Sequence, residues 1–89
     1  MTSQTPTGGM ATELADDLLK MITAEVSTDP SYEIELATDL LLTGLVDSLG
    51  VVMIVGWIED RLGIEIDPAD VVLDNFQTVG QMLSYLEAR

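Results

Sequence analysis

Apolar residues recur at helical spacing in three separate stretches of this chain, and strand-like alternation is confined to a few residues. In the first stretch, Leu14, Leu18 and Ile22 repeat at steps of four residues, which predicts a helix over about residues 10–26. Pro30 cannot continue such a helix and also restricts the residue before it. The pattern therefore favours an all-α fold over any sheet.

The second stretch has a defined beginning and end. Asp47 or Ser48 can cap the start of a helix that runs to about Leu62. Gly63 suits the left-handed position that often follows a helix. The residues expected to face the core, at steps of three and four, are Val52, Val55, Ile58 and Leu62. The residues left on or near the other face are Leu49, Gly50, Met53, Trp57 and Asp60.

The remainder of the chain predicts two further helices. Asp67-Pro68 can start a short third helix, because proline suits the first helical position. Thr78 and Gln81 have the spacing of a capping box that opens a last helix. The expected fold is a small four-helix bundle with a long loop between helices 1 and 2 and a short third helix.

The connection between the first two helices, residues 27–46, is unusually long. Loops of more than about 12–15 residues without structure of their own are uncommon and often functional. The leucines and isoleucine within it indicate that it is pinned to the core, and Gly44 marks a turn before the next helix. Residues 1–9 are rich in Ser, Thr, Pro and Gly, which is typical of a flexible leader. The domain itself is expected at residues 10–89.

Charge and composition exclude several functions. Asp and Glu outnumber Lys and Arg by 16 to 3, giving a formal net charge of −13. This charge repels phosphate backbones and anionic lipids, so neither nucleic acid nor a membrane is an expected partner. The chain has no Cys and no His, which excludes disulfides, thiolate zinc sites and a serine-histidine-aspartate triad. We therefore assign no catalytic residue.

A calcium sensor would also be small, helical and acidic. The stretch that begins at Asp67 lacks the glycine at its sixth position and has Thr78 where a bidentate Glu belongs. No metal site is expected.

The longest apolar stretch runs from Leu49 to Ile58 and is interrupted by Gly50 and Gly56. It is well short of the roughly 18 residues that span a bilayer. No Lys or Arg precedes Lys20, so a secretory signal is not expected. These features favour a cytoplasmic location.

The most informative local feature is Gly44-Leu45-Val46-Asp47-Ser48-Leu49, a turn that delivers a serine to the start of a helix. In the simplest interpretation, Asp47 and Ser48 only cap the helix. In a functional interpretation, the free N–H groups and dipole of a helix N-terminus favour a phosphate, so a serine there can carry a phosphoester. Without a histidine this serine is not an activated nucleophile, and another enzyme would have to modify it.

Residues 38–49 resemble the signature of acyl and peptidyl carrier proteins. The features that carry the resemblance are Asp47-Ser48-Leu49, the Gly44-Leu45 turn before it, and Asp39-Leu40 further upstream. The similarity continues through residues 58–66 and 75–79, and it covers roughly residues 12–88.

The resemblance implies a specific chemistry. Family members are four-helix bundles whose serine receives 4′-phosphopantetheine from coenzyme A, through a separate Mg²⁺-dependent transferase. Ser48 falls on that serine, and Asp47 on an acid implicated in transferase recognition. The protein would be a non-catalytic carrier that holds intermediates as thioesters on the thiol of the arm, which also accounts for a chain without Cys.

The resemblance also implies partners. They are a phosphopantetheinyl transferase, an acyl- or aminoacyl-loading enzyme (an adenylating ligase or an acyltransferase) and a downstream synthase or transferase. The carrier itself is expected to be a monomer. The residues expected to face these partners are Asp47, Leu49, Met53, Trp57 and Asp60.

The helix after the serine differs from that of fatty-acid-type carriers, which line its exposed face with acids. Gly50 and Met53 occupy positions where that subtype usually has acids, and Trp57 is bulky where small residues are common. Exposed Met and Trp are typical of adaptable contact surfaces. We therefore expect more apolar docking than in fatty-acid synthesis.

These features, with Asn75-Phe76 before the last helix and a chain of one domain's length, favour a discrete carrier in polyketide or nonribosomal peptide biosynthesis. Three alternatives remain open: a D-alanyl carrier, a fatty-acid-type carrier and, from a different class, an unmodified acidic helical adaptor.

Overall fold

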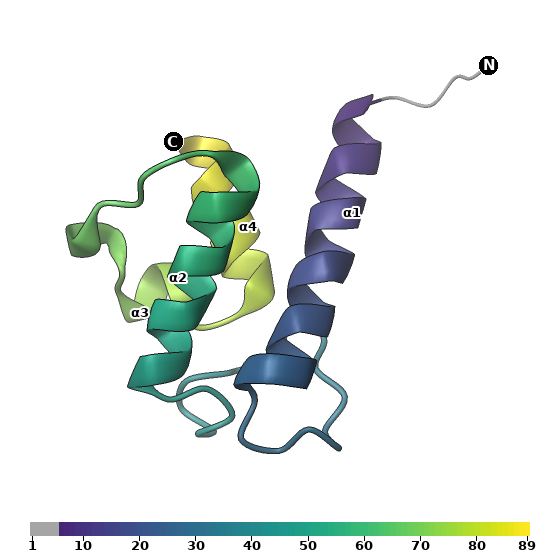
Figure 1. Ribbon diagram of the computed structural model, residues 1–89, viewed down its shortest axis with the longest axis vertical. Coiled ribbons are helices and arrows are strands. Elements are labelled where there is room, and N and C mark those ends of the chain that lie inside the picture. Colours follow the sequence, from purple (N-terminus) through teal and green to yellow (C-terminus); the bar gives the residue numbers. More distant parts are fainter. Residues whose placement is uncertain (1–5) are drawn as a thin grey trace.

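The computed structural model describes residues 6–89, with side chains from Thr12 onward, and all its regular elements are helical (Figure 1). In chain order they are α1 (Pro6–Met21), the π-helical turn η1 (Ile22–Val26), α2 (Ser48–Leu62), the 3₁₀ turn η2 (Pro68–Asp70), α3 (Leu73–Phe76) and α4 (Val79–Ala88). No strand occurs within the described residues. The expected all-α fold, with its long loop and short third helix, is confirmed.

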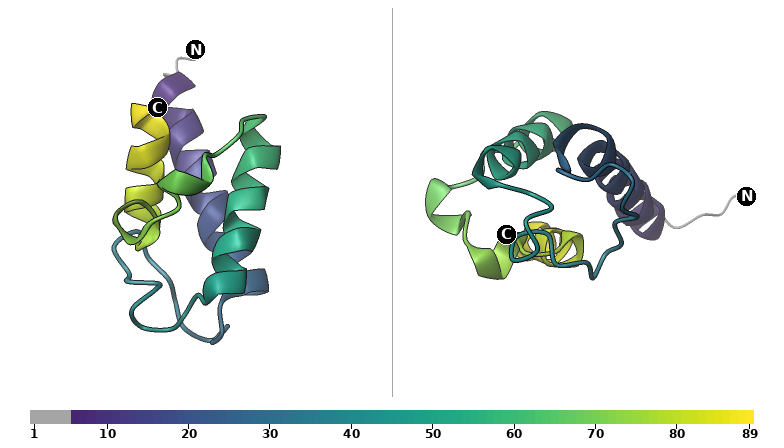
Figure 2. Two further views of the ribbon diagram at one scale, coloured as in Figure 1. Left: turned by 90° about the vertical axis from the view of Figure 1, so that its left-hand side faces the viewer. Right: turned by 90° about the horizontal axis from the view of Figure 1, so that it is seen from below.

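The three longer helices lie side by side, and α1 runs in the opposite direction to α2 and α4 (Figures 1 and 2). The long loop crosses the end of the bundle at which α2 begins. Ser48 therefore lies at the loop end, and the C-terminal Arg89 lies at the other end, where its Nη2 donates to the Glu65 carbonyl at 3.0 Å. Among the described helices, none is both long and apolar enough to cross a bilayer.

The long loop contributes to the core as the helices do. Ile34, Leu40 and Val46 come from this loop, and all three are buried. Full burial of such a side chain stabilises the fold by about 1.5–3 kcal/mol. The loop is therefore pinned to the core, as its composition predicts. The remaining buried cluster is Leu18, Met21, Ile22, Ile54, Ile58, Ile66, Phe76, Val79 and Met82.

The first helix differs from its expected bounds at one end. It ends at Val26 as predicted, although its last turn is π-helical, with the Ser27 N–H donating to the Ile22 carbonyl at 2.7 Å. It begins at Pro6 rather than at residue 10. Residues 1–5 of the expected leader lie outside the described part of the chain.

The face of α2 that packs on the core is only partly the predicted one: Ile58 is buried and Val55 is half-buried against the core, as expected. Gly50, Ile54 and Ile58 are buried, whereas Val52 is 66% exposed and Leu62 is 38% exposed. The prediction failed at Val52 and missed Gly50 and Ile54 because residues 49–58 are apolar or Gly throughout, so their periodicity does not distinguish one face from another.

Close packing at Gly50 fixes the face that α2 presents. A Cβ at this position would lie 2.7 Å from Val26 Cγ1 and 2.9 Å from Val46 Cγ1, both closer than real side chains approach. Glycine therefore lets the first turn of α2 lie directly against the end of the first helix and the end of the long loop.

The third helix begins later than predicted. Asp67 does cap a turn with Pro68 at its first position, accepting from the Ala69 N–H at 2.9 Å, but this turn is a short 3₁₀ segment. Val71 and Val72 follow it with non-helical backbone angles, as their β-branched side chains favour. The α-helical element is α3, four residues long.

The other helix boundaries lie where the sequence places them. Gly63 ends α2 in the left-handed conformation with φ 66°. Thr78 and Gln81 form both halves of the predicted capping box at the start of α4. Local chemistry therefore sets these helix ends.

Candidate functional site

Ser48 is the first residue of α2, and its side chain is exposed. The helix cap is made by its neighbour: Asp47 Oδ1 accepts a hydrogen bond from the Gly50 N–H at 2.8 Å. Among residues 12–89 the Ser48 hydroxyl has no hydrogen-bond partner. Because Asp47 supplies the cap, Ser48 is not needed for it, and its hydroxyl is exposed and available to a modifying enzyme.

The backbone around Ser48 also suits a phosphoester. The N–H groups of Ser48 and Leu49 have no acceptor in the described part of the chain, as is usual in the first turn of a helix. Such N–H groups, together with the positive end of the helix dipole, favour negative charge. A phosphate bonded to the Ser48 hydroxyl would lie next to them.

Asp39 organises the loop that leads to this serine. Its Oδ1 accepts from the N–H groups of Leu41 at 3.2 Å and Leu42 at 2.9 Å. Its Oδ2 accepts from Nε2 of Gln77, the residue that ends α3 just before α4, at 2.9 Å. In the sequence, Asp39 is notable only as part of the carrier signature. The structure shows that it joins the loop to the junction between α3 and α4.

Backbone hydrogen bonds complete the connection from Asp39 to Ser48. The Leu40 N–H donates to the Gln77 carbonyl at 2.8 Å, and the Val46 N–H donates to the Leu40 carbonyl at 2.9 Å. Between them, Gly44 adopts a φ of 81°, a left-handed angle that glycine accommodates without strain. The turn before the serine is therefore held at both ends.

The hydrogen bonds to Asp39 lower the pKa of its carboxyl below the ordinary value of 3.8. The Leu42 N–H makes the largest contribution, followed by the Gln77 amide. Because the pKa is lower in the folded state, the charged carboxylate stabilises the fold above the ordinary pKa. This stabilisation is lost as the pH falls through the folded pKa.

We expect Asp39→Asn to lower the melting temperature by a few degrees at pH 7, because the amide keeps the shape of the side chain but loses its charge. The difference from wild type should narrow as the pH falls below the ordinary carboxyl value of 3.8, and it should be lost as the pH falls through the lower pKa of Asp39 in the folded state. Thermal unfolding followed by circular dichroism from pH 7 to pH 2.5 measures this. Glu33→Gln, an exposed change on the same loop, should show no such convergence. A constant difference for Asp39→Asn at every pH would contradict the account.

The residues expected to face partners do not all lie together. Leu49 and Met53 are exposed in the first two turns of α2, beside Ser48. Asp60 is exposed, but it lies about 18 Å further along the helix at 1.5 Å per residue. Trp57 is half-buried against the core.

Trp57 is covered by a charged side chain from its own helix. The Arg61 guanidinium lies over the Trp57 ring, 5.4 Å from the centroid, and Arg61 Nη1 pairs with Asp17 Oδ2 at 2.8 Å. This places Trp57 beside the junction between α2 and α1. It is less available to a partner than Leu49 or Met53.

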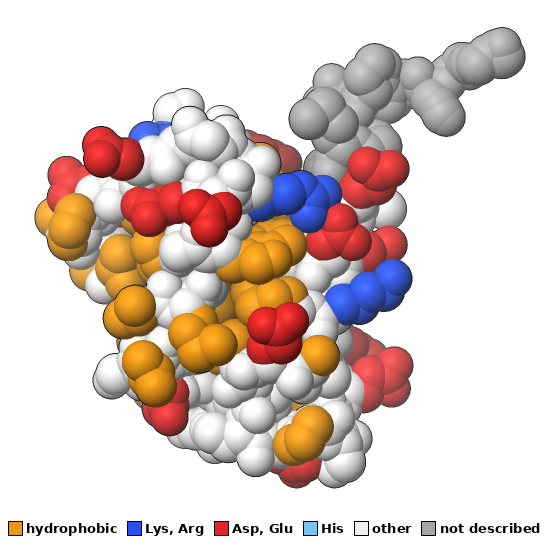
Figure 3. All heavy atoms as spheres, in the orientation of Figure 1, with side chains coloured by type: hydrophobic (Ala, Val, Ile, Leu, Met, Phe, Trp, Pro, Cys, Tyr) orange, Lys and Arg blue, Asp and Glu red, His pale blue; other side chains and the backbone are white. Residues whose placement is uncertain are grey.

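Two exposed apolar residues near the serine escape the sequence-based prediction. Val52 was expected to face the core, and Leu42 was not distinguished from its neighbours in the run Leu40-Leu41-Leu42. Leu42 is the most exposed of the large hydrophobic residues described, at 72%. Hydrophobic side chains gather on the face of the molecule over α2 (Figure 3).

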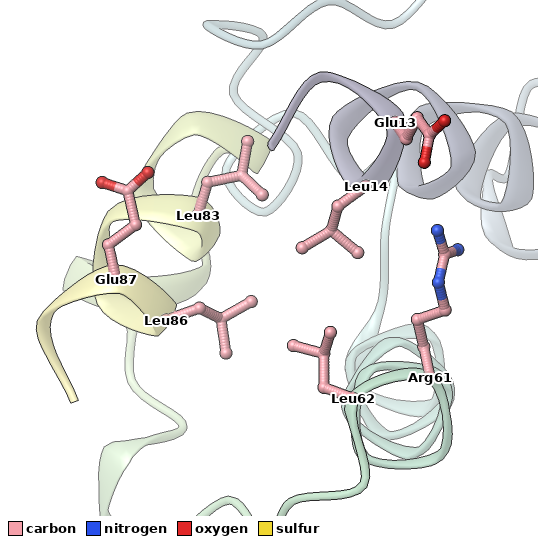
Figure 4. Close-up of a pocket in the computed structure, with 7 residues that line it drawn as sticks. All are labelled: Glu13, Leu14, Arg61, Leu62, Leu83, Leu86 and Glu87. Carbon is pink, nitrogen blue, oxygen red and sulfur yellow. The ribbon is translucent and has the colours of Figure 1, made fainter. Parts of the chain in front are cut away.

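A separate apolar pocket of about 250 Å³ lies between α1, the end of α2 and α4 (Figure 4). It is lined by Leu14, Leu62, Leu83 and Leu86, with Glu13, Arg61 and Glu87 around them. Leu62 is about 21 Å from Ser48 along α2 at 1.5 Å per residue. This pocket is therefore not part of the site at Ser48. Among the described residues, no group of three or more His, Cys, Asp or Glu could hold a metal ion.

Residues 16–86 match the model of the family described as "Phosphopantetheine attachment site". The match covers most of the chain, and the chain therefore belongs to this family of carrier domains. No curated protein matches the sequence.

Family membership defines the chemistry. The protein is a non-catalytic carrier, and its prosthetic group is 4′-phosphopantetheine. When bound, this group supplies a thiol that holds cargo as a thioester. A phosphopantetheinyl transferase and loading enzymes are the general classes of partner. The free hydroxyl and the adjacent N–H groups of Ser48 fit the phosphate end of the group.

Proposed function

We propose that 4′-phosphopantetheine is attached to Ser48 and that the protein is a discrete cytoplasmic carrier in polyketide or nonribosomal peptide biosynthesis. Domain 10–89 would present acyl or aminoacyl intermediates to successive enzymes. The observation that carries the proposal is the exposed Ser48 hydroxyl, which is free because Asp47 makes the helix cap.

The other described serines support this choice by contrast. The Ser27 hydroxyl donates to the Asp29 carbonyl at 3.1 Å, and the Ser31 hydroxyl donates to Asp29 Oδ1 at 2.7 Å. Ser84 is exposed, but it lies in the middle of α4, where the backbone N–H groups are used within the helix. Among these residues, Ser48 alone combines an exposed hydroxyl with a helix N-terminus.

The distribution of charge along α2 supports the proposed class of pathway. From Ser48 to Ile58 this helix has no charged residue, although the whole chain has a net charge of −13. Gly50 does not distinguish this protein from fatty-acid-type carriers, because it is buried and a residue there could not present an acid to a partner. Met53, exposed and uncharged, does contribute. An enzyme with a basic docking patch would find no matching carboxylate in the first turns of α2.

The class of pathway is tested with the holo protein and a malonyl transferase from fatty-acid synthesis. A fatty-acid carrier serves as the positive control. We expect kcat/KM for malonyl transfer to this protein to be at least about tenfold lower, equivalent to roughly 1.4 kcal/mol of lost transition-state stabilisation. Equal values would favour the fatty-acid alternative. Failure of wild-type protein to accept the arm at all would favour the unmodified adaptor.

A further inference from the structure

Leu42 is held in an exposed position by a turn with many hydrogen bonds. The Gly44 N–H donates to the Leu41 carbonyl at 3.2 Å, which closes the turn Leu41–Gly44. Asp39 Oδ1 accepts from the Leu42 N–H itself, and the Thr43 hydroxyl donates to the Asp39 carbonyl at 2.6 Å. The chain therefore fixes the backbone of a leucine whose side chain is 72% exposed.

This turn lies at the same end of the molecule as Ser48. The Val46 N–H bond to the Leu40 carbonyl closes the loop just before Asp47 and Ser48. On α2, Leu49, Val52 and Met53 follow at helical spacing and are 68%, 66% and 41% exposed. We call Leu42, Leu49, Val52 and Met53 the serine-end apolar surface.

The transferase must cover the residues around Ser48. Before the arm is attached, the reacting group is the Ser48 hydroxyl on the protein surface. The transferase must therefore bring coenzyme A directly to this hydroxyl. A standard interface buries about 800 Å² on each partner and includes roughly 20–30 residues a side. A contact of that size centred on Ser48 includes its exposed neighbours in the first turns of α2 and in the adjoining loop.

A second copy of the chain is a poor occupant of the same surface. Each copy has a net charge of −13, and like charges of this size oppose association. The transferase is the partner that the chemistry at Ser48 requires.

We propose that Leu42 is a contact residue for the phosphopantetheinyl transferase, and that Asp39 is a positioning residue that fixes Leu42 for this contact. The proposal rests on the proposed attachment at Ser48. Asp39 is half-buried and its carboxylate is hydrogen-bonded to Gln77. It therefore affects docking indirectly, by fixing the turn that carries Leu42.

The first test compares Leu42→Ser with Leu62→Ser, a matched change at the far end of α2. With apo protein, coenzyme A, Mg²⁺ and a broad-specificity transferase, Leu42→Ser should raise KM for the carrier about tenfold with little change in kcat. Leu62→Ser should leave KM near the wild-type value. Binding of the transferase to the same variants in a Ser48→Ala background, measured by calorimetry, should weaken in parallel. Unchanged KM and affinity for Leu42→Ser would overturn the proposal.

The second test separates positioning from general stability. Asp39→Ala should raise KM in the same direction, and the double variant Asp39→Ala/Leu42→Ser should be no worse than Leu42→Ser alone. Additive effects would overturn the positioning role of Asp39. Should Asp39→Ala not fold, Gln77→Ala, which removes the bond to Asp39 Oδ2, takes its place in the cycle. Wild-type protein that is never modified would instead overturn the proposed function.

Discussion

Gly50→Asp is expected to destabilise the protein strongly, because Gly50 is buried where α2 packs against its neighbours. The new Cβ would lie 2.7 Å and 2.9 Å from two valine methyl groups, and 3.4 Å from the carboxylate oxygen Asp47 Oδ1. Overpacking of this kind costs about 1–3 kcal/mol, and burial of an unpaired charge adds to it. We expect a loss of about 3 kcal/mol or more and a fall in melting temperature of roughly 10–25 °C.

Gly56 provides a matched control on the same helix. A Cβ there meets nothing within 4 Å, so Gly56→Asp should change stability by less than about 1 kcal/mol. The alanine pair separates shape from charge: Gly56→Ala should stabilise the helix by up to about 1 kcal/mol, whereas Gly50→Ala should destabilise it. Thermal and urea unfolding measure all four variants. Similar losses at the two glycines would contradict the packing that we describe.

Gly50 shows that a residue beside the carrier signature can have a structural role that the sequence alone does not indicate. Taken alone, a glycine after Asp-Ser-Leu suggests a surface that lacks an acid. In the structure it is a buried contact between α2, Val26 and Val46. The residue therefore reflects how closely two helices pack, and of the two positions that lack an acid, Gly50 and Met53, only Met53 is exposed.

The sequence was sufficient for features that depend on local chemistry. Gly63 and the Thr78–Gln81 box were predictable because a helix end needs a side-chain acceptor or a left-handed residue at a fixed position. For the start of α2 the sequence offered Asp47 or Ser48, and the structure shows that Asp47 makes the cap. The place of Ser48 after a turn and at the start of a helix was predictable for the same reason, whereas its role as attachment site is what the resemblance to carrier proteins implies. The buried part of the long loop followed from its apolar residues.

Features that depend on contacts between distant segments were not predictable in the same way. The buried face of α2 depends on Val26 and Val46 reaching Gly50, and a uniformly apolar helix gives no periodic signal of this. The hydrogen bond between Asp39 and Gln77 joins residues 38 positions apart. The same carboxylate accepts from the N–H of the exposed Leu42. Neither the position of Leu42 nor the extent of the serine-end apolar surface could be inferred from three consecutive leucines.

Ser48→Ala is expected to abolish attachment of the arm while leaving the fold intact. The substitution removes the hydroxyl that would form the phosphoester, and this hydroxyl makes no hydrogen bond among residues 12–89. Alanine also has a higher helix propensity than serine, and the cap is provided by Asp47, so the melting temperature should change by only a few degrees. Ser84→Ala, at an exposed site on α4, should be modified as fully as wild type.

The most direct measurement of the central claim is the intact mass of apo protein after incubation with coenzyme A, Mg²⁺ and a broad-specificity phosphopantetheinyl transferase. We predict that wild type and Ser84→Ala each gain the mass of one phosphopantetheine arm, and that Ser48→Ala gains none. An arm on folded Ser48→Ala protein, or none on folded wild type, would contradict the assignment of Ser48 as the attachment site.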